Sequence, residues 1–268
     1  MHKTICFINQ KGGCGKSSSC FHLAGTLASM GKRVLIIDTD PQGSISQGFF
    51  GPDATHRLPE SDTIAALFDM NRGRVERESL VRSTSIASVS VVSSNHHLSG
   101  FNTPMPRDTG MRQFVLREFV DGMSGWDLVL IDCPPNLYQC SWNAMIASDF
   151  VVIPVPPEDF GTQGIRIVHQ AIQSASTLNP RLRLLGNLVT RMDRRLLIHR
   201  AFEAQLRGSF SESVLQAVIP ELSAFKVALA CRQPVYQYAP GSQAALAMQS
   251  LAMEMMGRMN AIDGRRAA

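Results

Sequence analysis

The chain has 268 residues, with 26 Lys and Arg against 22 Asp and Glu and a formal net charge of +4. This length is sufficient for a full hydrophobic core, and we expect one domain over residues 1–268. The chain has no run of 18 apolar residues, and its start, MHKTICFINQ, lacks the layout of a signal peptide, which excludes a membrane span and predicts a cytoplasmic protein. The six cysteines lack zinc-site spacing, so we expect reduced, mostly buried thiols.

Short apolar runs recur along the chain, and most lack polar alternation, as strands buried on both faces should. The predicted strands are Thr4–Asn9, Val34–Asp38, Val89–Ser93, Leu128–Asp132, Val151–Val155, Leu184–Val189 and Val214–Ile219. Helical periodicity predicts helices over Ser17–Met30, Met111–Val120, Ile165–Leu178 and Ala244–Met259. Residues 51–62 and 100–110, rich in Pro, Gly, Asp and Thr, are predicted to be surface loops. This alternation predicts an α/β fold with a doubly wound, mainly parallel sheet, helices on both faces and ligands at the carboxyl ends of the strands.

The first predicted strand runs into a glycine-rich turn, NQKGGCGKSSSC. It nearly fits the phosphate-loop pattern G-x-x-x-x-G-K-[ST], but Gln10 stands at the first glycine position and a second lysine, Lys11, follows it. The three glycines of the turn permit positive φ and close backbone approach, so the N–H groups of residues 13–18 can converge on phosphate oxygens. These glycines are Gly12, Gly13 and Gly15.

The helix predicted after this turn begins with a cation and a hydroxyl. Lys16 adds a full positive charge to the partial charge of the helix N-terminus, and both favour phosphate. The Ser17 hydroxyl is an oxygen ligand of the kind that Mg²⁺ prefers. The turn is therefore predicted to bind a nucleotide with magnesium.

Acidic residues end two later strands. Asp132 ends LVLID and is predicted to lie beside the phosphate loop, where a carboxylate can hold Mg²⁺ directly or through water. Asp38 and Asp40 end the second strand in VLIIDTDPQG. Taken alone they could cap the strand or form a turn before Pro41, but next to a phosphate loop we prefer one of them as the residue that orients attacking water.

Several blocks together resemble one family, the ParA/MinD group of deviant-Walker ATPases, and within it the ParA-type partition ATPases. KGGCGKS, at residues 11–17, is similar to the family's K-G-G-x-G-K-[ST], in which the early lysine is the signature. DTDPQGS and LVLIDCPP, at residues 38–44 and 128–135, are similar to its second and third motifs. Later blocks match at residues 151–165, 189–193 and 234–245, so the resemblance spans almost the whole chain.

The resemblance implies roles for particular residues. Lys16 would bind phosphates in its own subunit, whereas Lys11 would reach across a nucleotide sandwich dimer to the phosphates of the partner. Asp40 matches the water-activating position, and Asp38 and Asp132 match acids near the magnesium, with Ser17 as a further ligand. The nucleotide-binding residues implied are Lys11, Gly12, Gly13, Cys14, Gly15, Lys16, Ser17, Ser18, Arg191 and Pro220. Cys14 departs from the commoner small aliphatic residue, and a thiol beside phosphates would be open to oxidation.

Charge is distributed unevenly along the chain. Residues 1–150 carry 13 basic against 14 acidic side chains, residues 151–268 carry 13 against 8, and residues 181–232 alone carry nine against four. A basic surface favours polyanions, and backbone neutralisation supplies most non-specific DNA affinity. The candidate DNA-binding residues are Arg191, Arg194, Arg195, Arg200, Arg207, Lys226 and Arg232.

The leading hypothesis is therefore a DNA-partitioning ATPase. ATP would drive formation of a homodimer, the dimer would bind DNA non-specifically and so associate with the nucleoid, and a ParB-like centromere-binding adaptor would stimulate hydrolysis and release. Because the chain starts almost at its first strand, an N-terminal helix-turn-helix domain is not expected.

Two alternatives remain open. A MinD-like membrane-associated relative would end in a basic amphipathic helix, but LAMEMMGRMNAIDGRRAA is sparse in basic residues and looks more like a helix that closes the core. A ParA-like ATPase that positions another cargo is equally compatible with the motifs, because the partner protein selects the cargo. The sequence does not separate plasmid, chromosome and other cargoes.

Overall fold

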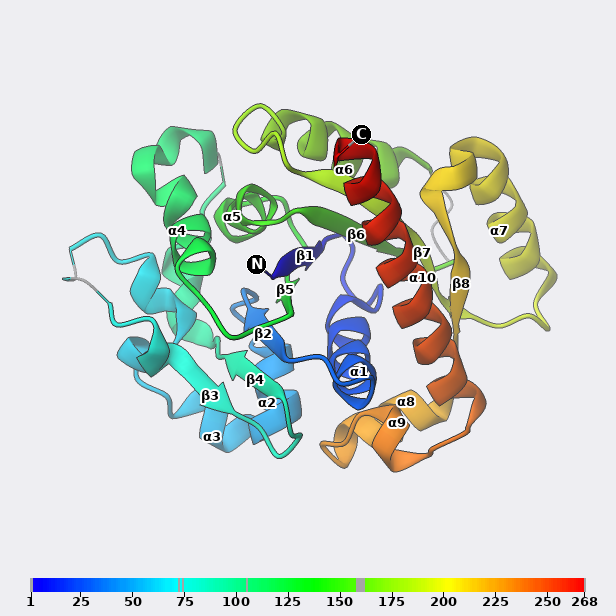
Figure 1. Cartoon of the computed structure of the whole chain (residues 1–268), viewed down its shortest axis with the longest axis horizontal. Helices are drawn as coiled ribbons and strands as arrows, with labels where there is room; N and C mark the ends of the chain where they lie inside the picture. The colour runs from blue at the N-terminus through cyan, green and yellow to red at the C-terminus, as the bar shows by residue number, and fades with distance from the viewer. Residues whose placement is uncertain (1, 72, 74, 105, 158–161, 268) are drawn as a thin grey trace.

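The computed structural model describes residues 2–71, 73, 75–104, 106–157 and 162–267. Its centre is an eight-stranded sheet in the order β3-β4-β2-β5-β1-β6-β7-β8, in which only the short edge strand β3 is antiparallel to its neighbour (Figure 1). The strands are β1 (Lys3–Phe7), β2 (Val34–Asp38), β3 (Val81–Ser83), β4 (Val89–Val92), β5 (Leu128–Asp132), β6 (Phe150–Val155), β7 (Arg183–Met192) and β8 (Val214–Pro220). The predicted doubly wound, mainly parallel α/β fold is confirmed.

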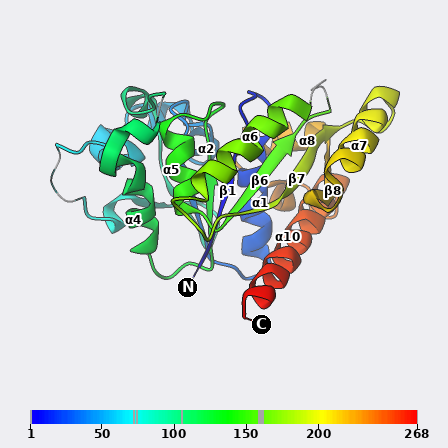
Figure 2. The same cartoon turned by 90° about the horizontal axis from the view of Figure 1, so that it is seen from above.

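Helices cover both faces of the sheet. They are α1 (Lys16–Ser29), α2 (Ser44–Phe50), α3 (Pro52–His56), α4 (Val115–Asp121), α5 (Gln139–Ala147), α6 (Thr162–Ala175), α7 (Leu197–Phe210), α8 (Ser223–Ala230), α9 (Val235–Tyr238) and α10 (Gln243–Ala267). One apolar core lies under α4 to α7 and a second under α1, α2, α8 and α10. Seen from above, α6 and α10 lie on opposite sides of β6 and β7 (Figure 2).

The central strands form where uninterrupted apolar runs predict them. Every residue of β2 and of β5 is buried, which is the pattern of parallel strands covered on both faces. Their bounds match the predicted Val34–Asp38 and Leu128–Asp132. Since β5 lies between β2 and β1, the carboxyl ends of these three strands meet at one edge of the sheet.

Other predictions of local structure were wrong. The predicted helix Met111–Val120 is α-helical only from Val115, because residues 106–114 form 3₁₀ turns interrupted at Gly110. Residues 51–62, predicted to be a loop, contain α3 and a 3₁₀ turn, and residues 106–110 of the second predicted loop lie in the 3₁₀ segment. β3, α2, α5 and α7 to α9 were not predicted, and residues 158–161 of the block at 151–165 lie outside the described residues.

The C-terminal helix packs against the sheet. Met248, Leu251, Met255 and Met259 of α10 are buried in the second core, where the helix lies against β8 and α1. The apolar face of α10 is therefore occupied by the fold, as predicted for a helix that closes the core. Within the described residues, no helix is both long and apolar enough to cross a bilayer.

Candidate functional site

The turn between β1 and α1 has the backbone that its glycines allow. Gly13 and Gly15 adopt φ values of 70° and 91°, in the left-handed region, and α1 begins directly at Lys16. A Cβ on Gly15 would also lie 3.5 Å from the Thr190 Cβ, so the loop lies close against β7. The predicted strand, glycine turn and helix are thus in place.

Residues of β7 hold two carbonyl groups of this loop. The Thr190 hydroxyl donates to the Cys14 carbonyl at 2.8 Å, and the Arg191 guanidinium donates to the Gly13 carbonyl at 3.3 Å. A trans peptide directs its C=O and N–H groups in opposite directions, so the amides of residues 14 and 15 point away from these two side chains. Both amides are in this way turned away from their partners on β7, which leaves them available to a phosphate.

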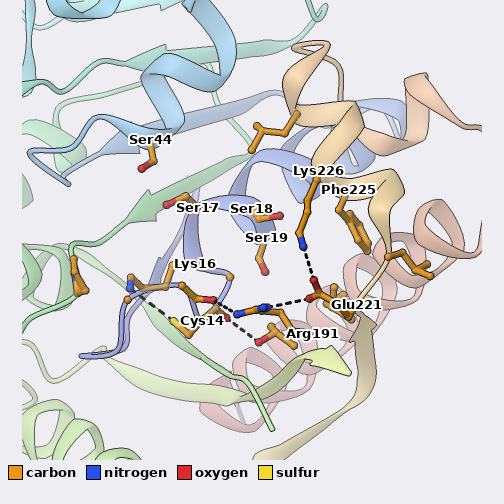
Figure 3. Close-up of a pocket in the computed structure, with 18 of the residues that line it drawn as sticks. Cys14, Lys16, Ser17, Ser18, Ser19, Ser44, Arg191, Glu221, Phe225 and Lys226 are labelled. Atoms are coloured by element: carbon orange, nitrogen blue, oxygen red, sulfur yellow. Dashed lines mark hydrogen bonds and ion pairs between the residues drawn. The ribbon is translucent and has the colours of Figure 1, made fainter. Parts of the chain in front are cut away.

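The Lys16 side chain folds back over the loop. It is only 6% exposed, and its ammonium donates to the Lys11 carbonyl at 3.1 Å. The ammonium also lies 3.7 Å from the Cys14 sulfur (Figure 3). The Lys11 amide donates to the Asn9 side chain, whose own amide donates to the Pro154 carbonyl of β6. The backbone of Lys11 is therefore fixed on both sides.

A cavity of about 400 Å³ opens above the loop. Its phosphate-loop end carries backbone amides, hydroxyls and Lys16, and the opposite wall, from β8 and α8, is largely apolar. The lining residues are Gly12, Gly13, Cys14, Gly15, Lys16, Ser17, Ser18, Ser19, Asp40, Ser44, Pro135, Thr190, Arg191, Ile219, Pro220, Glu221, Leu222, Phe225, Lys226 and Leu229. A polar end for phosphates beside an apolar slot suits a nucleotide.

Two fully buried carboxylates lie behind this cavity. Asp38 and Asp132 are paired in register at the ends of β2 and β5, and each is 0% exposed. Burial raises the pKa of Asp38 to about 7 and that of Asp132 well above its usual range, and for Asp132 the neighbouring Asp38 adds to the shift. Ser17 and Lys16 lie close enough to Asp132 to oppose it.

The two carboxylates differ in their partners. Asp38 accepts hydrogen bonds from the Ser46 amide and hydroxyl and from the Asp40 amide, whereas neither oxygen of Asp132 has a partner in the described part of the chain. A buried, unpartnered carboxylate is unfavourable unless a cation or donor satisfies it. Asp132, with the Ser17 hydroxyl beside it, therefore fits Mg²⁺, which prefers oxygen ligands.

Asp40 lies at the boundary between the buried acids and the cavity. It is 7% exposed, lines the cavity and accepts from the Gln42 amide at 2.9 Å. Burial raises the pKa of its carboxyl, and the Lys16 charge opposes that shift. Cys14 is 0% exposed, and burial also raises the pKa of its thiol, which disfavours the oxidation that the sequence suggested.

The structure brings most of the predicted nucleotide-binding residues together. All of them line the cavity except Lys11, whose side chain does not belong to the lining. Sequence reasoning missed Thr190, Glu221 and Phe225. Glu221 joins Arg191 and Lys226 across the cavity wall at 2.9 and 2.7 Å (Figure 3). The resemblance marked Pro220 in this segment but not Glu221, whose position just after β8, at the carboxyl edge of the sheet, could have indicated it.

The candidate DNA-binding residues do not form one free basic face. Four of them form ion pairs: Arg191 and Lys226 with Glu221, Arg195 with Asp193, and Arg207 with Glu203. Arg232 lies against the junction of α2 and α3, because a Cβ on Gly51 would be 2.7 Å from a nitrogen of its guanidinium. Arg194, in the turn before α7, and Arg200, in its first turn, are exposed and form no ion pair with another described residue.

Comparison with known proteins places this site in context. A family model described as an AAA domain matches residues 2–184. The chain is 35% identical to the chromosome-partitioning ATPase Soj of Thermus thermophilus, over 96% of each chain, and 33% identical to the chromosome partitioning protein ParA of Caulobacter vibrioides, over 96% of this chain and 94% of that one. Among solved structures, cobyrinic acid a,c-diamide synthase of Mycobacterium smegmatis with bound ADP and magnesium has a TM-score of 0.77 and 25% identity, covering 94% of this chain and 93% of that one.

Proposed function

The chain belongs to the ParA/MinD superfamily of deviant-Walker ATPases, and we propose that it is a DNA-partitioning ATPase that works as an ATP sandwich dimer. The observation that carries the proposal is a phosphate cradle with two lysines, one inside the cavity and one outside it, above a buried carboxylate that has no partner among the described residues. ATP with Mg²⁺ is the ligand. A ParB-like adaptor is the partner that stimulates hydrolysis and release.

Different residues of the site bind the phosphates, the magnesium ion and the base of the nucleotide. The Lys16 ammonium and the amides of residues 13–18 would hold phosphate oxygens, while Ser17 and Asp132 would hold the magnesium ion. When bound, that ion neutralises charge on the phosphates. Pro220, Leu222 and Phe225 form the apolar wall for the base.

Asp40 is the residue that orients the attacking water. It is the one acid of the DTD segment that lines the cavity, since Asp38 lies behind it and is occupied by three donor groups. Phosphoryl transfer depends chiefly on positioning and charge stabilisation. A carboxylate with a fixed backbone next to the phosphates supplies the positioning.

Lys11 is the residue that requires a partner. Its backbone is fixed on both sides, by the hydrogen bond to Asn9 and the one from Lys16, yet its side chain lies outside the lining of its own cavity. A cation presented in this way can reach phosphates held by a second subunit, as an arginine finger does in trans. Dimer formation would then complete the nucleotide site.

DNA binding rests on the two exposed arginines in and just before the first turn of α7. Arg194 and Arg200 are available for phosphate contacts, whereas the ion-paired arginines must first give up a carboxylate partner.

Retention of the protein on unrelated DNA, with ATP and with ADP, tests this part of the proposal. We expect retention only with ATP, and a steep decline as salt rises, because released counterions dominate such binding. Retention that ignores salt, or that does not depend on ATP, would contradict the DNA role.

A further inference from the structure

Both carboxylate oxygens of Asp38 accept hydrogen bonds from neighbouring residues. Its Oδ2 accepts from the Ser46 amide at 2.9 Å and from the Ser46 hydroxyl at 2.7 Å, and its Oδ1 accepts from the Asp40 amide at 3.1 Å. Both oxygens are therefore already directed toward donors on the segment that carries Asp40. Asp132, its neighbour in register, accepts no hydrogen bond of this geometry from the described residues, and the Ser17 hydroxyl is the donor that lies beside it.

The direction of the Ser46 hydroxyl is determined by a third strand. The Ser94 amide, just after β4, donates to the Ser46 oxygen at 2.9 Å. A hydroxyl has one proton, so an oxygen that accepts from Ser94 directs that proton to Asp38. Ser46 and Ser94 are both 0% exposed, so water does not compete for these bonds.

The same strand end also fixes the middle of the segment. Gly43 adopts φ 64°, and a Cβ at this position would lie 2.6 Å from the Ser94 carbonyl oxygen. The backbone from Asp38 to Ser46 is thus held at Asp38, at Gly43 and at Ser46. Asp40 lies inside this segment, so the position of its carboxylate depends on those contacts.

We propose that Ser46 is a positioning residue: by holding Asp38, it fixes Asp40 for hydrolysis and leaves Asp132 as the carboxylate for magnesium. This inference rests on the proposed ATPase function. The strand order supports it, because β5 adjoins β1 and its phosphate loop, whereas β2 lies one strand further away. Asp38 then serves to hold the backbone of residues 38–46, which carries Asp40, and does not bind the metal.

The first test compares Ser46→Ala with a matched control. Ser93→Ala is the control, because Ser93 is also 0% exposed and its hydroxyl has no partner in the described residues. We expect Ser46→Ala to lower kcat for ATP hydrolysis about ten- to a hundredfold, with KM for ATP changed by less than about threefold, because a small misplacement affects catalysis more than binding. Ser93→Ala should match the wild type, and Ser46→Thr, which keeps the hydroxyl, should recover most of the lost rate.

The second test does not depend on turnover. The thermal stabilisation by ADP is measured with Mg²⁺ and with EDTA for Asp38→Asn and for Asp132→Asn. We expect Mg²⁺ to increase the thermal stabilisation by ADP in Asp38→Asn, as in the wild type. In Asp132→Asn the stabilisation should be the same with Mg²⁺ and with EDTA.

Two results would overturn the inference: loss of the magnesium-dependent stabilisation in Asp38→Asn, or a wild-type kcat in Ser46→Ala. A wild-type protein that binds ADP and Mg²⁺ but does not hydrolyse ATP would instead refute the proposed function, and the two failures are therefore distinguishable. If Ser46→Ala fails to fold, the comparison of the two aspartate variants still decides the magnesium assignment.

Discussion

The phosphate-loop end of the sheet and the basic segment 181–232 differ in how they hold charge. At the phosphate loop, Lys16 lines the cavity, Asp38 and Asp132 lie paired behind it, and all three side chains are almost completely buried. In the basic segment, Arg195 and Arg207 are satisfied by carboxylates of their own neighbourhood. A short glycine-rich motif predicts which side chains meet at one site, because its backbone allows few conformations. A count of basic residues over a segment does not predict which of their side chains are left unpaired for binding DNA.

The largest effect should come from the buried lysine of the first region. We expect Lys16→Ala to weaken binding of an ATP analogue with Mg²⁺ about ten- to a hundredfold, the range given by a charge-assisted hydrogen bond of about 1.5–3 kcal/mol. Isothermal titration calorimetry measures the change. Lys32→Ala, just beyond the other end of α1, is the control and should bind as the wild type does. Equal affinities for the two variants would show that the cavity does not hold phosphate.

A smaller effect is expected on DNA binding, and it should differ between the unpaired and the ion-paired arginines of the basic segment 181–232. Replacing Arg194 and Arg200 by alanine should weaken ATP-dependent retention on DNA and lower the slope of log affinity against log salt by about one for each DNA phosphate that is no longer neutralised. Arg207→Ala should change this slope little, since Arg207 is paired with Glu203 at 2.8 Å. Binding titrations at several salt concentrations measure both variants. If Arg207→Ala lowered the slope as much as the double variant, ion pairing would not decide which arginines bind DNA.

The smallest effect concerns one thiol in each region. Cys231 is exposed, whereas Cys14 is buried in the phosphate loop with a raised pKa, and the thiolate is the reactive form. We expect a thiol reagent to modify Cys231 first in the native protein, and Cys231→Ser to lack this fast phase. Mass spectrometry of the labelled peptides identifies the residue. Rapid modification of Cys14 would mean that the phosphate loop is more open than the structure shows.

Much of the fold could be predicted because its central strands are uninterrupted apolar runs, which are typical of parallel strands buried on both faces. β2 and β5 match their predicted bounds. β3 was missed because its three residues, half-buried or exposed, carry no apolar run. The predicted helix start at Met111 was wrong because residues 111–114 belong to a 3₁₀ segment and α4 begins only at Val115. Apolar periodicity does not distinguish a 3₁₀ segment from the first turn of an α-helix.

The site could be predicted where backbone chemistry is local. Gly13, Gly15 and Lys16 follow from one motif, and their geometry agrees with it. The contacts of Thr190 and Glu221 join segments far apart in the chain, so no local pattern indicates them. Ser46 was missed for a related reason: its role depends on Ser94, which only the sheet brings next to it.

The most direct test of a nucleotide site shared between two subunits is whether dimer formation depends on Lys11. Asp40→Ala and the double variant Lys11→Ala/Asp40→Ala are compared with ATP and Mg²⁺ by light scattering after size exclusion, with nucleotide binding checked for each by calorimetry. The account predicts that both bind ATP, that Asp40→Ala has twice the 29.4 kDa mass of one chain, and that the double variant has the mass of one chain. A double variant that dimerises as well as Asp40→Ala would contradict it.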